Sequence, residues 1–310
     1  MPRRPDALAI AWRAALTGAD ADAYDALAAR GHFLQTRATA ALAAAGRARQ
    51  VRHVVVRAAG QPIGAAQLLR LGPLAWIERG PIAAPPALPA VLAAIERAAR
   101  RRAIVWLEVS PYLDAAAARA LLDRGYTPEP GFGGLHRHTG RLAIGASEAE
   151  LLAGPARAKL RTELRRAERH GATAHTDDPS APSLLARLAG RSPAWARAVA
   201  DLVARGAATV AIGRDAGGPL GAVLVAAHAG LAAYLAGAAI AEPRPYGKLA
   251  LPLVAAIGWA RGRGAHTFDV GGLPAPGDAD PKRAAIARFK AMFAPEPVAL
   301  VGPHRRWLWP

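Results

Sequence analysis

Residues 265–293 combine side-chain types and spacings that suit chemistry on a carbonyl group. A short β-like run ends at the paired glycines Gly271 and Gly272, where backbone amides can approach a ligand closely. The predicted helix that follows carries Lys290, whose ammonium could stabilise negative charge developing on an oxygen. A plain strand, loop and amphipathic helix of an α/β core accounts for the same residues.

The helix predicted to contain Lys290 has a regular apolar pattern. Ile286, Phe289 and Phe293 are spaced so that they form one buried face. Lys290 lies about 100° round from Phe289, at the edge of that face, so we expect its ammonium to be partly desolvated. Lysine is rare in this chain, since 36 of the 40 basic residues are arginine. The arginine-rich composition therefore does not explain a lysine at this edge.

A second helix, predicted over residues 155–170, has a strongly basic surface that only Glu163 and Glu168 interrupt. Its basic side chains are Arg157, Lys159, Arg161, Arg165, Arg166 and Arg169. A helix surface of this kind could contact the phosphates of a nucleic acid. An ordinary solvated helix face explains the pattern equally well.

The turn at residues 244–248 leads into a further helix, and a helix N-terminus is a ready site for an anion. Acetyltransferases of the GNAT type use a Gln/Arg-x-x-Gly-x-Gly/Ala loop there to hold the diphosphate of coenzyme A. The chain has Arg244, Gly247 and Leu249 at the three positions. Because leucine replaces the last small residue, we expect weak or no coenzyme A binding. A plain turn is the alternative.

The composition limits the classes of function. The chain has 310 residues and a formal net charge of +17, which attracts polyanions such as nucleic acid, an anionic membrane or phosphorylated substrates. The absence of cysteine excludes disulfides and thiolate metal sites, and is compatible with a reducing cytoplasm.

His136 and His138 share one side of a predicted strand. We interpret them as a surface pair and predict no metal site, because no acid lies at ligand spacing.

The order of the predicted elements repeats in the two halves of the chain. Each half has helices, a meander of strands, a helix, a strand and a helix, which suggests a duplicated α/β unit with a seam near residue 146.

Three further expectations concern single segments. Residues 6–30 are predicted to be helical. Residues 220–241 are apolar and long enough to span a bilayer, but a turn near their middle predicts two strands and no transmembrane segment. Trp307 and Trp309 are expected to seal a core.

Four segments together resemble the Fem family (FemABX), which transfers amino acids from aminoacyl-tRNA to peptidoglycan precursors. The letters F-L-Q at 33–35 and R-G-P at 79–81 are similar to two signatures of its first domain. Residues 159–171 resemble its basic helix, which ends in R-R-A-E-x-x-G. Residues 269–290 resemble its D-x-G-G segment followed by F-K. The order and spacing match across nearly the whole chain.

The resemblance implies an α/β fold with two GNAT-like domains in tandem, residues 1–146 and 147–297, and no coiled-coil insertion. Residues after about 298 would return to the first domain. Lys290 would stabilise charge at the ester carbonyl, Phe289 would position it, and Asp269 would shape the floor of the site. The implied substrate-binding residues are Gln35, Tyr234, Arg244, Tyr246, Gly271 and Gly272. The six basic residues of the second helix would contact tRNA, and no cofactor is implied.

The implied partners are aminoacyl-tRNA and an amine acceptor, by family default lipid II or a UDP-MurNAc-peptide. The reaction would occur in the cytoplasm, with peripheral contact to the inner face of the membrane. The chain departs from the family where Thr39 and an alanine run replace a Trp and a Lys, and where Ser110 replaces an acid. The acceptor could therefore be another amine, such as a secondary metabolite. An acyl-CoA-dependent N-acyltransferase and a non-catalytic polyanion-binding module are the alternatives.

Overall fold

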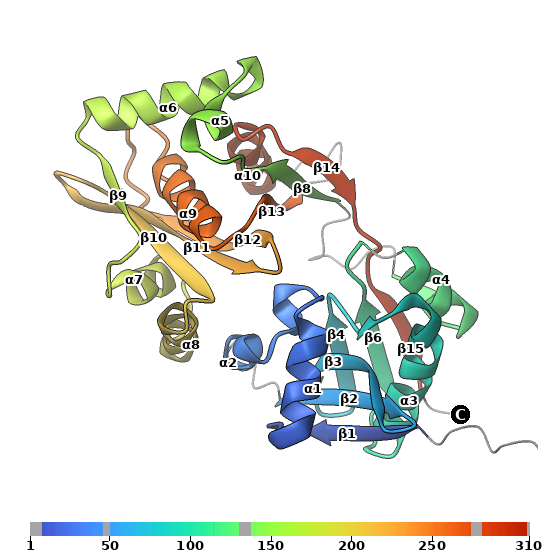
Figure 1. Ribbon diagram of the computed structural model, residues 1–310. Helices are drawn as coiled ribbons and strands as arrows, with labels where there is room; N and C mark the ends of the chain where they lie inside the picture. Colours follow the sequence, from blue (N-terminus) through green and yellow to red (C-terminus); the bar gives the residue numbers. More distant parts are fainter. Residues whose placement is uncertain (1–7, 46–49, 114, 130–137, 274–280, 309–310) are drawn as a thin grey trace, which may run out of the picture. The chain divides into compact units, whose positions relative to one another are not determined.

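The computed structural model describes residues 8–45, 50–113, 115–129, 138–273 and 281–308, and contacts divide the chain into two compact units (Figure 1). Unit 1 comprises Met1–Leu135 and Leu300–Pro310, and unit 2 comprises His136–Ala299. The seam expected near residue 146 falls after strand β8 (His138–Ala143), whereas the contacts divide the chain before it. The reason is that β8 pairs with strands of unit 2 on both of its sides.

Unit 1 is built on a sheet whose strands are ordered β1-β2-β3-β4-β6-β15-β7, with β5 beside β3. Its strands are β1 Ala9–Arg13, β2 Gln50–Ala58, β3 Gln61–Leu71, β4 Leu74–Glu78, β5 Ile82–Ala83, β6 Trp106–Ser110, β7 Thr127–Pro128 and β15 His304–Trp307. The β2–β3 hairpin turns at Ala59 and Gly60, which both have positive φ, as a two-residue hairpin turn requires. The β4–β6 pair is parallel.

Helices cover both faces of this sheet. They are α1 Gly18–Ala28, α2 Ala40–Ala44, α3 Leu88–Arg100 and α4 Ala115–Asp123. Side chains alternate between the two faces along each strand. Val54 and Val56 pack in the core that contains α3, whereas Val55 packs with α1. Two separate apolar layers therefore hold the sheet of unit 1 in place.

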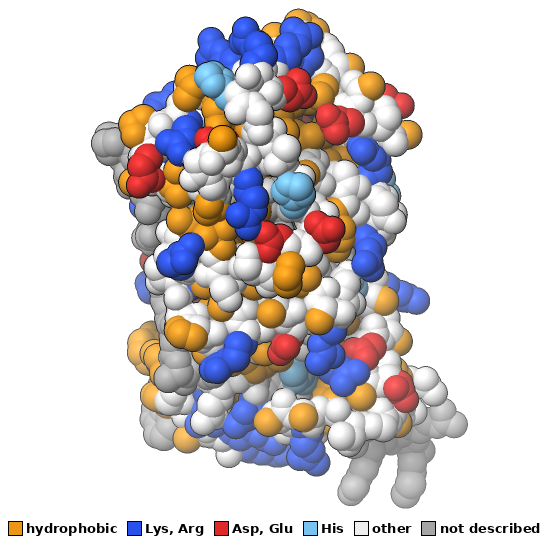
Figure 2. Space-filling view, turned by 90° about the vertical axis from the view of Figure 1, so that its left-hand side faces the viewer, with side chains coloured by type: hydrophobic (Ala, Val, Ile, Leu, Met, Phe, Trp, Pro, Cys, Tyr) orange, Lys and Arg blue, Asp and Glu red, His pale blue; other side chains and the backbone are white. Residues whose placement is uncertain are grey.

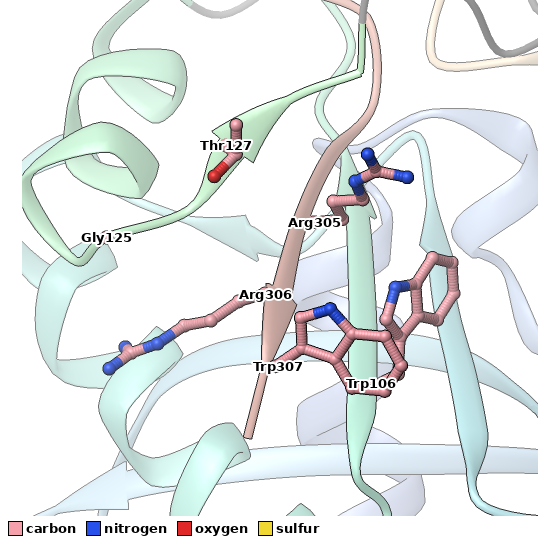
Figure 3. Close-up of a pocket in the computed structure, with 6 residues that line it drawn as sticks. All are labelled: Trp106, Gly125, Thr127, Arg305, Arg306 and Trp307. Carbon is pink, nitrogen blue, oxygen red and sulfur yellow. The ribbon is translucent and has the colours of Figure 1, made fainter. Parts of the chain in front are cut away.

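Strand β15 returns the chain to unit 1, where it lies between β6 and β7. Leu308, which follows it, is buried in the α3 core. The expectation that Trp307 seals a core is wrong, because alternation along the strand directs it outward and leaves it 66% exposed. Figure 3 shows Trp307 beside Trp106, with Arg306 extending to the other side of the strand. Trp309 lies outside the described residues.

Unit 2 is built on a second sheet, ordered β14-β8-β13-β12-β11-β10-β9. Besides β8, its strands are β9 Thr173–His175, β10 Ala208–Asp215, β11 Gly218–His228, β12 Leu231–Ala239, β13 Thr267–Leu273 and β14 Glu296–Ala299. The two strands predicted within residues 220–241 are confirmed as β11 and β12. None of the described helices is long and apolar enough to cross a bilayer.

Six α-helices are described in unit 2: α5 Glu148–Leu152, α6 Ala158–Arg169, α7 Ala181–Leu188, α8 Pro193–Ala204, α9 Ala250–Gly262 and α10 Pro281–Ala291. Ser192 caps α8, since its hydroxyl accepts a hydrogen bond from the amide of Trp195. Helix α9 supplies Leu253 and Ile257 to the main core. Phe268 of β13 and Phe293, just after α10, complete that core. The core thus fixes β13 and α10 relative to each other.

The prediction of helix over residues 6–30 is wrong for its first part. Residues Ala9–Arg13 form strand β1, and helix α1 begins only at Gly18. Trp12 packs in the sheet core with Val54, its direct partner on β2. The spacing of Leu8, Trp12 and Leu16 imitates a helix, but pairing with β2 determines the structure.

Candidate active site

A cavity of about 500 Å³ lies in unit 2 where β12 and β13 separate. The two strands pair in parallel only from Leu231 to Ala233, opposite residues 267–269, and β12 then continues without that partner. The lining residues are Tyr234, Gly237, Ala239, Gly247, Lys248, Leu249, Gly272, Arg283, Ala285, Ile286, Phe289 and Lys290. Gly272 of the glycine pair and the Phe-Lys pair found in the sequence therefore contribute to one cavity, whereas Gly271 is not among its lining residues.

Lys290 places an ammonium in the wall of this cavity. Its side chain is only 6% exposed, and Nζ donates a 2.6 Å hydrogen bond to the carbonyl oxygen of Gly272. Nζ lies 5.8 Å from the centre of the Tyr234 ring, within the range of a cation–π interaction. Burial lowers the pKa of Lys290 to about 8, against a smaller opposing effect of Asp269. Lys290 therefore stays mostly protonated at neutral pH although its side chain is largely shielded from solvent.

Asp269 shapes the glycine turn and is absent from the residues that line the cavity. It is 4% exposed, and its Oδ1 accepts hydrogen bonds from the hydroxyl of Thr139 and, at 2.7 Å, from the amide of Gly271. Gly271 has φ +75°, which favours glycine. Because Asp269 holds the amide of Gly271, the carbonyl of Gly272 remains directed toward Lys290.

The apolar face expected for α10 is buried only at one end. Phe293 is fully buried, but Phe289 is half-buried and Ile286 is 40% exposed. Both Phe289 and Ile286 line the cavity, so the prediction of one continuous buried face is wrong. The ring of Phe289 meets that of Phe293 edge to face, with centres 5.7 Å apart. Phe289 thus connects the cavity wall to the core, next to Lys290.

Tyr234 lines the cavity, whereas Arg244 and Tyr246 do not. Burial raises the pKa of the Tyr234 hydroxyl to about 12, so that group stays neutral. Arg244 and the Tyr246 hydroxyl both bind Asp215, at 2.9 and 2.8 Å. These two hydrogen bonds, with Tyr246 the stronger influence, lower the pKa of Asp215. Arg244 and Tyr246 therefore hold residues 244–246 against Asp215, at the end of β10.

The basic helix predicted from the sequence is α6, and its positive side chains fall into two groups. Arg161 donates hydrogen bonds to the carbonyls of Leu152 and Gly154, and Arg157 donates one to the carbonyl of Phe293, so both hold unit 2 together. The exposed basic side chains are Lys159, Arg165, Arg166 and Arg169. Figure 2 shows Lys and Arg side chains gathered at the end of unit 2 where α6 lies.

No protein-family model and no curated protein matches the sequence. The known proteins to which the chain is similar are therefore found among solved structures. The crystal structure of FemX matches with 18% identity over 96% of this chain and 97% of that chain, at a TM-score of 0.76. A tandem GNAT protein from the clavulanic acid biosynthesis pathway matches over 98% of this chain and 99% of its own length, with 17% identity and a TM-score of 0.62.

The chain has a tandem GNAT fold. Another solved structure with this fold is the C-terminal domain of a putative lysylphosphatidylglycerol synthetase from Agrobacterium fabrum. It matches at 16% identity and a TM-score of 0.62, over 94% of this chain and 92% of that chain. The tandem GNAT fold agrees with the repeated element order and with the Fem resemblance found in the sequence.

In the first GNAT-like unit, Gln35 is buried at the point where β3 and β4 cease to pair. There its side-chain amide bonds the backbone of both strands in place of the hydrogen bonds between them. Its Oε1 accepts a 2.7 Å hydrogen bond from the amide of Gln67, and its Nε2 donates to the carbonyls of Gln67 and Glu78. A Cβ at Gly80 would lie 2.7 Å from Cδ of Gln35. The F-L-Q and R-G-P signatures therefore form one interlocked structure, in which the polar atoms of Gln35 are already engaged.

Replacing Gln35 with methionine should destabilise unit 1 by roughly 2–4 kcal/mol, because buried groups of Gln67 and Glu78 lose their partners. Urea unfolding followed by circular dichroism would measure the effect. Gln61→Met, at the exposed start of β3, is the matched control and should change stability by less than about 0.5 kcal/mol. A Gln35→Met protein with normal stability but weakened substrate binding would instead favour the substrate-contact role implied by the resemblance.

Sequence reasoning missed two features of this tandem GNAT fold. Arg283 lines the cavity, but the sequence patterns of its helix pointed only to Lys290 and the apolar residues. Glu108 of β6 is 3% exposed, and burial, with the charges of Glu78 and Glu129, raises its pKa to about 7. An acid between apolar residues on a predicted strand was the available signal for Glu108.

No three His, Asp or Glu side chains of the described part of the chain form a cluster that could hold a metal. His136 lies outside the described residues, and His138 is half-buried at the start of β8. His138 is not among the residues that line the cavity described above.

Proposed function

We propose that the protein transfers an aminoacyl group from aminoacyl-tRNA to an amine acceptor and so forms a peptide bond. The observation that carries this proposal is the buried ammonium of Lys290 in the wall of the unit 2 cavity, beside the glycine turn. The tandem GNAT fold is an acyltransferase fold. The Fem resemblance and the structural match to FemX support a peptidoglycan precursor, lipid II or a UDP-MurNAc-peptide, as the acceptor.

The chemistry needs few protein groups because the ester on tRNA is already activated. The acceptor nitrogen attacks the ester carbonyl, the C–N bond forms, the C–O bond to the ribose breaks, and the amine proton passes to the ribose oxygen. The ammonium of Lys290 would stabilise the oxyanion between these steps. The family resemblance implies that a ribose hydroxyl relays the proton, so no protein base is required.

The exposed basic side chains of α6 suit the tRNA body, since they could neutralise phosphates without base-specific contacts. Charged tRNA is found in the cytoplasm, which is where we place the reaction. A lipid-linked acceptor would add peripheral contact with the inner face of the membrane. The net charge of +17 favours both partners.

A transfer assay tests this function directly. The full chain would be incubated with a pool of radiolabelled aminoacyl-tRNAs and a panel of amine acceptors that includes UDP-MurNAc-pentapeptide and lipid II. We expect label from one or a few amino acids to appear in an acceptor by an amide bond. Acyl transfer from acetyl-CoA, with none from tRNA, would instead identify an N-acyltransferase.

A further inference from the structure

The loop that precedes α9 has all of its prominent polar groups engaged within the protein. Arg244 binds Asp215, and Nζ of Lys248 donates hydrogen bonds of 2.6 and 2.8 Å to the carbonyls of Ile240 and Glu242. The amide of Gly247 donates a 2.6 Å hydrogen bond to Oε2 of Glu163 on α6. The groups of this loop that could bind a phosphate therefore already have partners within the chain.

The contact between Glu163 and Gly247 has the form of anion recognition. A backbone amide just before a helix N-terminus favours negative charge, and here a carboxylate of the chain supplies that charge. The side chain of Glu163 is 15% exposed, and its other oxygen lies 3.4 Å from Arg166. The ring of His170 packs on the ring of Tyr246, with ring centres 5.4 Å apart. This contact also holds the end of α6 against the loop.

The neighbouring side chain closes the remaining space. Leu249 packs against β11 at Gly221, where an added Cβ would lie only 2.7 Å from Cδ2 of Leu249. Both Gly247 and Leu249 line the cavity that contains Lys290. The occupied amide and the leucine thus lie on the side of the cavity where α9 begins.

We propose that Glu163 is a specificity-determining residue for the acyl donor. Its carboxylate accepts the hydrogen bond of the Gly247 amide and repels phosphate. The cavity therefore does not bind acyl thioesters of coenzyme A, whose carrier contains a diphosphate. The donor it admits, an acyl ester of a terminal ribose, rests on the proposed function. The exclusion of a diphosphate does not rest on the proposed function, because it follows from the contacts of the loop that precedes α9.

Calorimetric titration of the full chain with coenzyme A tests this role. The wild-type protein should show no binding at millimolar coenzyme A. Glu163→Ala, which frees the amide and removes the charge, should bind measurably, with a dissociation constant at least tenfold below the highest coenzyme A concentration at which wild type shows no binding. Glu163→Gln, which keeps an oxygen for the amide but loses the charge, should gain less. Glu168→Ala removes the same charge from an exposed position of α6 and should behave like wild type.

The outcomes separate this proposal from the proposed function. Micromolar binding by wild type, or an equal gain in Glu163→Ala and Glu168→Ala, would overturn the role of Glu163. A structural role alone predicts a lower melting temperature without any gain in binding, and if Glu163→Ala does not fold, Glu163→Gln decides. Failure of the tRNA transfer assay with normal coenzyme A results would remove the proposed donor but leave the exclusion intact.

Discussion

Replacing Lys290 with methionine is expected to lower the single-turnover rate of aminoacyl transfer by roughly a hundredfold or more, the effect of removing one oxyanion donor. The ammonium is buried, where an electrostatic interaction is stronger than in water. Lys290→Arg should recover little, since a broad guanidinium fork replaces a compact charge in a confined wall. The measurement is a rapid-quench assay with charged tRNA and saturating acceptor.

Methionine at position 290 should leave the melting temperature unchanged or raise it. Burial lowers the pKa of Lys290 from 10.5 to about 8, so keeping it charged in the folded protein has a cost on the order of 1–3 kcal/mol at neutral pH. Between these two pKa values the unfolded state binds more protons than the folded state. Stability of the wild-type protein therefore rises with pH from about 8 to 10.5, a rise that Lys290→Met should lack.

The same pKa predicts the pH dependence of the reaction. The transfer rate should first rise with pH as the acceptor amine loses its proton, and then fall above about 8 as Lys290 loses its own. Near-normal turnover in Lys290→Met would exclude Lys290 from the reaction. Loss of both activity and melting temperature would show that its hydrogen bond to Gly272 is chiefly structural.

Changing Lys159, Arg165 and Arg169 together to glutamine should weaken tRNA binding roughly ten- to thousandfold at low salt, because three phosphates are no longer neutralised. The slope of log affinity against log salt should fall by about 0.7–0.9 for each of these phosphates. These side chains are exposed on α6, so the change should not affect folding. Filter binding over a series of salt concentrations would measure both quantities.

The control for this variant removes equal charge from another exposed surface of unit 2. Arg187, Arg197 and Arg205, on or beside α7 and α8, are suitable for glutamine substitution. An equal drop in affinity in both triple variants would mean that tRNA responds only to net charge. Arg161, which the sequence placed in the same basic stripe, should instead affect stability through its bonds to Leu152 and Gly154.

Local patterns were sufficient to predict the fold class and the main elements of the site. The turn near the middle of residues 220–241 identified β11 and β12. The pattern failed at β1, since Ala9–Arg13 is a strand only because β2 lies beside it. Whether such a short alanine-containing segment pairs depends on residues far away in the chain.

The site shows the same division between local and distant information. Lys290 is recognisable from its rarity and its place beside an apolar face. The hydrogen-bond partners of Gln35 and Arg244 were not recognisable, because Gln35 binds Gln67 and Glu78 and Arg244 binds Asp215, all distant in sequence. Their surroundings are polar groups of other elements, whose identity no spacing rule predicts.

The position of β15 has a consequence for how the protein forms during synthesis. Strands β6 and β7 are made before unit 2, but β15, which lies between them, comes after it. Unit 2 is continuous in sequence and can fold as soon as it has left the ribosome. The β6 edge of unit 1 must wait unpaired until residues 304–308 arrive, and an open strand edge invites aggregation. Deleting the segment that contains β15 should therefore lower the yield of folded protein more than it lowers the activity of the molecules that do fold.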